Sequence, residues 1–178
     1  MHVRREQPAD HDAVRAVHTA AFRPDGTLTG DAVHGRAVVE ARLTDELRAD
    51  VGFLPHLSLV AVVEGSVAGH VIATRGWLEP LVVPVLGLGP LGVAPAAQRR
   101  GVGTALVHAL LAVAEACEER LVALLGSPEY YRRFDFRPAT ELGVEAPDPQ
   151  WGAHFQARRL TGGPVHGLFR YAEPFDRL

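Results

Sequence analysis

Gln98-Arg99-Arg100-Gly101-Val102-Gly103 joins an apolar, strand-like run at residues 86–93 to a strongly helical run at residues 104–117. Two glycines two positions apart let a backbone approach a ligand closely. The helix that follows begins with unpaired N–H groups and the positive end of its dipole, and two arginines add charge beside them. A pyrophosphate suits such a site, whereas an exposed loop that only starts a helix is the simpler interpretation.

A second glycine-rich motif, Gly87-Leu88-Gly89-Pro90-Leu91-Gly92, matches the dinucleotide-binding pattern G-x-G-x-x-G. That pattern requires a helix to begin at its third glycine. Val93-Ala94-Pro95 follows instead, and a proline favours an extended residue before it. We therefore interpret residues 87–93 as a strand with a kink or bulge, which disfavours a Rossmann site. A nucleotide-hydrolysing P-loop is excluded because its motif needs a lysine and the chain contains none.

The composition indicates one globular domain spanning residues 1–178, since 47% of the residues are hydrophobic and 22% are charged. A net charge of −3 does not favour nucleic acid as a partner. The polar N-terminus and the interrupted apolar runs predict neither a signal peptide nor a membrane span. A single cysteine cannot form an internal disulfide, so the cytoplasm is the expected compartment.

The spacing of apolar residues predicts helices at 8–22, 33–49 and 99–119, a short helix within 126–134, and strands at 1–6, 57–63, 67–74, 86–93, 121–125 and 136–140. Residues 64–66 read as a hairpin turn. Prolines at 80 and 84 indicate an irregular or edge segment at 77–84. Residues 155–160 and 165–171 look like a closing antiparallel pair. This order favours a mixed sheet covered by helices.

Two motifs of this sequence resemble those of the GNAT superfamily of N-acetyltransferases. Residues 91–106 resemble its acetyl-CoA motif, a strand followed by Q/R-x-x-G-x-G/A and a helix, and residues 125–139 resemble its second signature, with two adjacent tyrosines. Within this superfamily the sequence is most similar to the YhbS-like branch, whose residue pattern it also resembles at residues 40–48, 67–70 and 167–175. The resemblance covers nearly the whole chain. It implies an α/β (α+β) fold whose mixed, mostly antiparallel central sheet contains splayed parallel strands and carries helices on both faces.

The resemblance also implies an acetyl-CoA-dependent N-acetyltransferase without a metal, in which a primary amine attacks the thioester directly within a ternary complex. Strand backbone near Leu91 would pair with the pantetheine arm and polarise the thioester carbonyl, and amides at 99–104 would hold the pyrophosphate. Tyr131 matches the family tyrosine that protonates the leaving thiolate. The implied cosubstrate-binding residues are Leu91, Gly92, Val93, Gln98, Arg99, Arg100, Gly101, Val102, Gly103 and Thr104.

Three departures from the family pattern matter. Gly87 and Gly89 stand where many relatives carry an acidic or histidine base, so the proton of the amine would pass to water or to a carboxylate such as Glu79 or Glu40. A non-catalytic acyl-CoA-binding or sensing module is therefore the alternative, although Tyr131 favours an enzyme. Transfer of another acyl group, or transfer to a protein, is a further alternative. Asp135 replaces a usual glycine, and aspartate tolerates a positive φ better than most residues.

Nine histidines raise the question of a metal site, but the chain has no H-E-x-x-H motif and no cysteine cluster. His11 and His18 lie two turns apart on a predicted helix, and surface or core roles are favoured for them. His70, on a strand expected to approach the acceptor, is retained as an acceptor contact. Cys117 is predicted to be a small buried core residue.

The remaining candidates allow two interpretations each. Tyr130 is predicted to be a core aromatic, Arg132 and Arg133 are solvated charges or contacts of the CoA phosphates, and Trp77 and Trp151 are packing residues rather than walls of an acceptor pocket. The expected partner is a small-molecule or peptide amine, with neither nucleic acid nor membrane. A homodimer is expected only by analogy with the fold.

Overall fold

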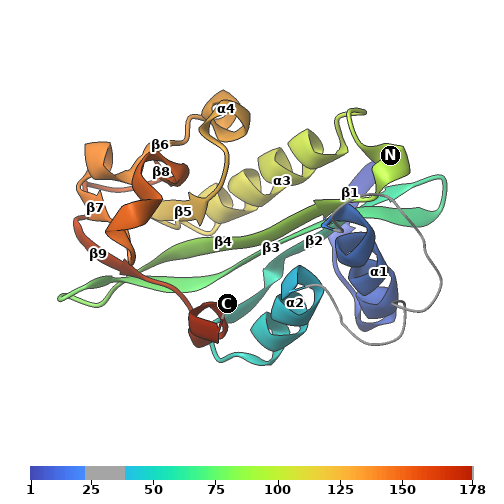
Figure 1. The fold of residues 1–178 in the computed structure, drawn as a ribbon, viewed down its shortest axis with the longest axis horizontal. Helices are drawn as coiled ribbons and strands as arrows, with labels where there is room; N and C mark the ends of the chain where they lie inside the picture. Colours follow the sequence, from blue (N-terminus) through green and yellow to red (C-terminus); the bar gives the residue numbers. More distant parts are fainter. Residues whose placement is uncertain (23–38, 178) are drawn as a thin grey trace.

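The computed structural model describes residues 1–22 and 39–177, and these residues form a sheet of nine strands covered by helices (Figure 1). The strands are β1 (His2–Arg5), β2 (Phe53–Val63), β3 (Ser66–Glu79), β4 (Val83–Val93), β5 (Leu121–Leu125), β6 (Arg137–Pro138), β7 (Val144–Glu145), β8 (Phe155–Arg159) and β9 (Gly167–Arg170). Strands β1 to β4 form an antiparallel meander, β4 pairs with β5 in parallel, and β8 pairs antiparallel with both β5 and β6. The predicted mixed and mostly antiparallel sheet is confirmed.

Helices cover both faces of this sheet, as predicted, with α3 on one face and α1 and α2 on the other (Figure 1). The α-helices are α1 (His11–Ala21), α2 (Val39–Ala49), α3 (Val102–Ala116) and α4 (Pro128–Tyr131), and the 3-10 helices are η1 (Pro8–Asp10), η3 (Pro95–Ala97), η4 (Arg132–Phe134), η5 (Ala139–Leu142), η6 (Pro149–His154) and η7 (Glu173–Arg177). Alternation along β3 explains the two layers: Val71 packs in the cluster with α3, whereas Ile72 packs with Leu47 of α2. No helix among the described residues has the length and apolar character needed to span a membrane.

Strands β4 and β5 separate soon after they meet. Their parallel pairing comprises Leu86 with Val122 and Gly87 with Ala123. Strand β4 also carries an irregularity against β3, because Val71 faces Leu91 while Ala73 faces Leu88. The predicted kink in this glycine-rich strand is therefore present as a bulge. The splay leaves the edge of β4 beyond Gly87 without a pairing from β5.

Residues 77–84, which were predicted to be an irregular or edge segment, form the end of the β3–β4 hairpin, where Trp77 faces Pro84 and Leu78 faces Val83. The segment is not irregular, but the edge alternative is confirmed at residues 83–85, which have no pairing with β5. Proline lacks a backbone N–H but is tolerated near the beginning of a strand, and Pro84 is the second residue of β4. Pro80 lies in the connecting turn.

The prediction that the two tail strands pair with each other is also wrong. Strand β8 pairs with β5 and β6, whereas β9 pairs antiparallel with β3 and in parallel with β7. The pairing of β2 with β3 ends at Thr74, so β3 has a free edge at residues 77–79 for β9. Each tail strand thus completes a different edge, which satisfies backbone groups that would otherwise remain unpaired.

Smaller differences concern the ends of elements. The third helix begins at Val102 rather than residue 99, because Gly101 has a φ of 81° and Arg99 a φ of 57°, neither of which is helical. The strand predicted at 136–140 is reduced to Arg137–Pro138, after which the chain enters η5. Residues 33–38 of the second predicted helix lie outside the described residues.

Candidate active site

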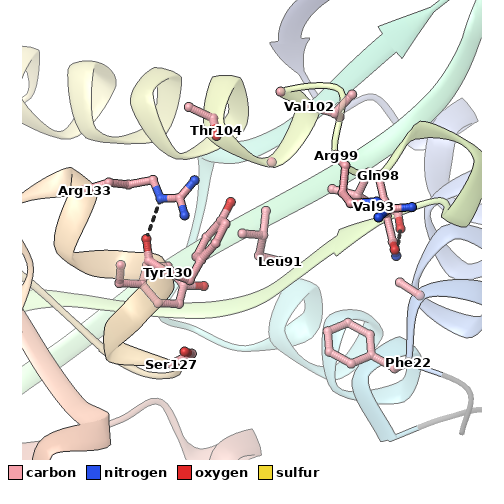
Figure 2. Close-up of a pocket in the computed structure, with 14 residues that line it drawn as sticks. Phe22, Leu91, Val93, Gln98, Arg99, Val102, Thr104, Ser127, Tyr130 and Arg133 are labelled. Atoms are coloured by element: carbon pink, nitrogen blue, oxygen red, sulfur yellow. Dashed lines mark hydrogen bonds between the residues drawn. The ribbon is translucent and has the colours of Figure 1, made fainter.

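A cavity of about 700 Å³ lies between the splayed end of β4, the N-terminus of α3 and the short helix α4 (Figure 2). Tyr130 and Arg133 lie at one side of the cavity, Leu91 in the middle and Phe22 at the far side. The lining residues are Ala21, Phe22, Leu91, Val93, Gln98, Arg99, Gly101, Val102, Gly103, Thr104, Ser127, Tyr130, Tyr131 and Arg133. Of the predicted cosubstrate-binding residues, Gly92 and Arg100 do not line this cavity.

The glycine-containing loop presents backbone donors to the cavity. The carbonyl of Gly101 accepts the first helical hydrogen bond of α3, from the amide of Ala105 at 2.9 Å. The amides of Val102, Gly103 and Thr104 precede that bond and have no acceptor within the helix. Gly101 is the N-cap residue of α3, and it has no side chain that could accept a hydrogen bond from these amides. Three free donors at the positive end of a helix dipole make an anion-binding site.

Strand β4 contributes both side chains and backbone. Leu91 and Val93 line the cavity, and their neighbour Gly92 turns to the opposite face, where a Cβ atom would lie 2.7 Å from Nδ1 of His18. The outer edge of β4 has no partner strand in this region, because β5 has already diverged. An extended ligand can therefore form hydrogen bonds with this edge as another strand would.

Tyr131 reaches the cavity from α4 while most of its ring is buried, with 9% of the residue exposed. The ring packs against the end of β5, where a Cβ atom on Gly126 would lie 2.5 Å from Cε2 of Tyr131. Burial, followed by the neighbouring Tyr130, raises the pKa of the Tyr131 phenol above its ordinary value of 10.0. The phenol is therefore protonated at neutral pH and can act as a proton donor.

The prediction that Tyr130 is a core aromatic is only partly confirmed, because its ring packs against Tyr131 and Phe134 of the core but is half-buried and also lines the cavity. The guanidinium of Arg133 lies 4.8 Å from the ring centroid, and its Nε donates to the Tyr130 carbonyl at 2.9 Å (Figure 2). Arg133 also lines the cavity, whereas Arg132 is exposed outside it. Asp135, at the end of the same segment, has a φ of 62°, which confirms the positive φ considered for it.

Strand β4 provides no base at the two positions that were noted in the sequence. The ring of Tyr171 occupies the space beside Gly87, where a Cβ atom would lie 2.8 Å from Cδ1 of Tyr171. Leu47 and Ile72 occupy the corresponding space at Gly89. Glu79 forms an ion pair with Arg170 at 3.0 Å. Neither Glu79 nor Glu40 lines the cavity.

Several other candidates lie away from the cavity. His70 is fully buried and contacts His18 and Ser58, so the prediction that it contacts the acceptor is wrong for this cavity. Trp77 lies beneath the guanidinium of Arg170 at 4.4 Å, and Trp151 packs in the cluster around Phe155 and Tyr171. No group of three His, Cys, Asp or Glu residues in the described part of the chain is placed to hold a metal ion.

The prediction that Cys117 is buried is wrong, because it is exposed at the C-terminal end of α3. The helix ends at Ala116, and Glu118 adopts a φ of 57° that turns the chain away. The helical pattern alone did not reveal this early end, since Cys117 follows Ala114 at the spacing of a core-facing position.

Comparison with known proteins identifies the kind of site. Residues 24–136 match the sequence profile of the acetyltransferase (GNAT) family. The chain belongs to the GNAT acetyltransferase family. Its relative YjhQ of Escherichia coli (strain K12), an uncharacterised N-acetyltransferase, is 34% identical over 145 residues, which are 76% of this chain and 79% of YjhQ.

Two solved structures agree with this GNAT assignment over nearly the whole chain. The YhbS N-acetyltransferase of Escherichia coli, in complex with CoA, has a TM-score of 0.84 and 27% identity, covering 99% of this chain and 92% of YhbS. A GNAT acetyltransferase of Brucella melitensis, in complex with acetyl-CoA, has a TM-score of 0.75 and 32% identity, covering 98% of this chain and 97% of that one. The expectation of an acetyl-CoA-dependent N-acetyltransferase is confirmed at the level of the family, and the sensing alternative is not supported.

Proposed function

We propose that residues 1–178 form a single GNAT domain that transfers an acetyl group from acetyl-CoA to a primary amine by direct attack within a ternary complex. One observation carries the proposal: a single cavity combines the free amides of α3, the unpaired edge of β4 and the protonated phenol of Tyr131. These are an anion site, a site for an extended arm and an acid. A CoA thioester needs all three.

The glycine loop is the proposed pyrophosphate site. The amides of Val102, Gly103 and Thr104 supply donors without side-chain rearrangement. The side chains of Arg99 and Arg133 line the same cavity and add positive charge. The CoA and acetyl-CoA bound in the YhbS and Brucella melitensis structures support a CoA ligand in the corresponding fold.

The proposed chemistry needs no acyl-enzyme intermediate. The amine nitrogen attacks the thioester carbon, a C–N bond forms, and the C–S bond breaks as the tetrahedral intermediate collapses. Backbone N–H near Leu91 stabilises the developing oxyanion. Tyr131 donates its proton to the departing thiolate, and its burial, which raises its pKa, keeps that proton in place beforehand.

The acceptor is proposed to be a small-molecule or peptide amine. Action in the cytoplasm and assembly as a homodimer are part of the same proposal; the first is supported by the chain's single cysteine and the second by analogy with the fold.

A crystal structure of the chain with CoA tests the placement of the ligand. We expect the pyrophosphate oxygens to accept hydrogen bonds from the amides of Val102 to Thr104, and the sulfur to lie within reach of the Tyr131 hydroxyl. A CoA molecule bound elsewhere, with this cavity unoccupied, would refute the assignment of these residues.

A further inference from the structure

A hydrogen-bonded series of buried polar side chains links Glu6, which directly follows β1, with β2, β3 and α1 on the face of the sheet opposite α3. Oγ of Ser58 donates to Oε2 of Glu6 at 2.5 Å and lies 3.0 Å from Nε2 of His70. Nδ1 of His70 lies 2.8 Å from Nε2 of His18. Arg48 of α2 forms an ion pair with Glu6, at the end of this hydrogen-bonded series that is opposite His18. Both imidazole rings have 0% exposure.

The ionised Glu6 determines the tautomers of both rings. Burial raises the pKa of Glu6, but the neighbouring His70 and the hydrogen bonds from Arg48 and Ser58 outweigh it and hold that pKa well below 4.5, so the Glu6 oxygens only accept hydrogen bonds. The single proton of the Ser58 hydroxyl therefore points to Glu6. The Ser58 oxygen must then accept a hydrogen bond from Nε2–H of His70.

The same reasoning extends to His18. Burial lowers the pKa of His70, and burial followed by the charge of His70 lowers the pKa of His18 to about 3, so both rings are neutral at pH 7. A neutral His70 that donates from Nε2 accepts at Nδ1, and Nε2–H of His18 supplies that hydrogen bond. Nδ1 of His18 is consequently a bare lone pair, and it is a buried atom without a hydrogen-bond partner among the described residues.

This lone pair lies directly behind strand β4, on the face opposite the cavity-lining side chains of Leu91 and Val93. Nδ1 lies 2.7 Å from where a Cβ atom of Gly92 would stand, and Gly92 separates the cavity-lining residues Leu91 and Val93. The other neighbour of the ring is Phe22, which stacks on it with centroids 6.0 Å apart and also lines the cavity. The glycine on β4 thus gives the ring its position immediately behind the strand that we assign to the thioester.

We propose that Nδ1 of His18 accepts the proton that leaves the acceptor amine. This inference rests on the proposed function and supplies the base that Gly87 and Gly89 cannot provide. A buried imidazole with a purely structural role would be expected to satisfy both ring nitrogens, whereas His18 satisfies one and directs the other toward β4. For the proton to arrive, the amine or an intervening water must reach Nδ1 between Gly92 and Phe22.

The proton balance is complete within the described residues. The ammonium of the tetrahedral intermediate gives one proton to Nδ1 of His18. Nε2–H of His18 can then pass to Nδ1 of His70, which moves the positive charge to a ring 3.6 Å from the Glu6 carboxylate. Glu6 remains ionised and stabilises that charge, much as a carboxylate orients and stabilises the histidine of a catalytic triad. Tyr131 supplies the separate proton that the thiolate takes.

Other charged groups near the pair affect its ability to accept a proton. Arg48 lowers the pKa of both imidazoles and His11 lowers that of His70, whereas Glu6 acts in the opposite direction on both. Gly92, on the β4 side, carries no charge. Substitution of His18 should therefore change the pH profile of the reaction as well as its rate.

The first test replaces His18 with glutamine. The side-chain amide of His18→Gln can still donate to His70, but it has no basic nitrogen. We expect kcat/KM for the acceptor to fall by about 10²-fold or more, the pH–rate profile to move to higher pH, and the stabilisation by acetyl-CoA to persist. His2→Gln, exposed on β1 and outside the hydrogen-bonded series, should retain the parent rate. Equal rates and profiles for His18→Gln and the parent would overturn the proposal.

A second test uses the parent protein and does not depend on the folding of a variant. Nitrogen-15 NMR of labelled histidine should show both His18 and His70 protonated at Nε2 and bare at Nδ1 near pH 7. A proton on Nδ1 of His18 would overturn the proposal. If the tautomers are as expected but the parent acetylates no amine, then the proposed function fails and this role of His18 fails with it. If the parent is active and His18→Gln has the same rate and pH profile, the proposed function stands without this base.

Discussion

The hydroxyl oxygen of Tyr130 lies 2.8 Å from the point where a Cβ atom of residue 103 would stand. Glycine is therefore the residue that lets α4 approach the N-terminus of α3 and close the cavity around the free amides. The relationship links the two sequence motifs in space, since Gly103 belongs to the first and Tyr130 to the second.

Gly103→Asp should abolish acetyl-CoA binding. The substitution adds a side chain that meets Tyr130 and a negative charge where the pyrophosphate is expected. A ligand that binds only the native state raises the melting temperature, so acetyl-CoA should stabilise the parent but not the variant. Gly163→Asp is the matched control, because no atom lies within 4 Å of a Cβ atom at that loop position. Equal stabilisation of parent and Gly103→Asp would remove the loop from the site.

Tyr131→Phe should impair the chemical step and leave acetyl-CoA binding intact. Phenylalanine keeps the packing against Gly126 but lacks the proton donor. We expect kcat to fall by roughly 10²- to 10⁴-fold, with little change in acetyl-CoA affinity, which is the signature of an interaction made mainly in the transition state. Tyr130→Phe is the control and should have a mild effect. An unchanged kcat for Tyr131→Phe would assign the acid to water or to another residue.

The glycine loop, the short helix that carries the two tyrosines and the central strands were predicted well, because each is indicated by a short, continuous sequence pattern. A glycine loop before a helix and the apolar run of β5 are visible in a short window. The pairing of β9 with β3 was not visible, since it depends on where β2 stops pairing at Thr74. The contact between His18 and Gly92 was equally hidden, because it joins residues 74 positions apart in the chain. The burial predicted for Cys117 failed because α3 ends one residue before it, at Ala116.

Stability should fall as the pH is lowered from about 6.5. Burial lowers the pKa of His18 from 6.5 to about 3, so between these values the unfolded chain binds a proton there that the native state does not. The free energy of unfolding therefore decreases with decreasing pH, by at most about 1.4 kcal/mol per pH unit for this one group. Glu6, whose pKa is held below 4.5, adds a loss of the same sign at lower pH.

Urea unfolding at pH values from 7.5 to 5.0 measures this dependence. His18→Gln should flatten it, because the variant has no group to titrate at that site. His2→Gln, exposed on β1, should keep the slope of the parent. Indistinguishable slopes for the parent and His18→Gln would show that His18 is not held neutral by burial.

Cys117 should react readily with thiol reagents in the folded protein, since it is exposed. We expect one reactive thiol for each native chain, because the sequence contains a single cysteine. Cys117→Ser should remove this background and leave acetyl transfer unchanged, because residue 117 is not part of the cavity. A thiol that reacts only after denaturation would instead support the burial predicted from the sequence.

The measurement that tests the central claim most directly is acceptor-dependent release of CoA by the Cys117→Ser chain. The chain has no lysine, so no ε-amine is available for self-acetylation, and a thiol reagent will then report CoA alone. With acetyl-CoA and a panel of polyamines, amino sugars, amino acids and peptides, we predict release that requires an amine and rises with pH as the amine deprotonates. Saturable stabilisation by acetyl-CoA without acceptor-dependent release across the whole panel would contradict the account and indicate a CoA-binding module without catalysis.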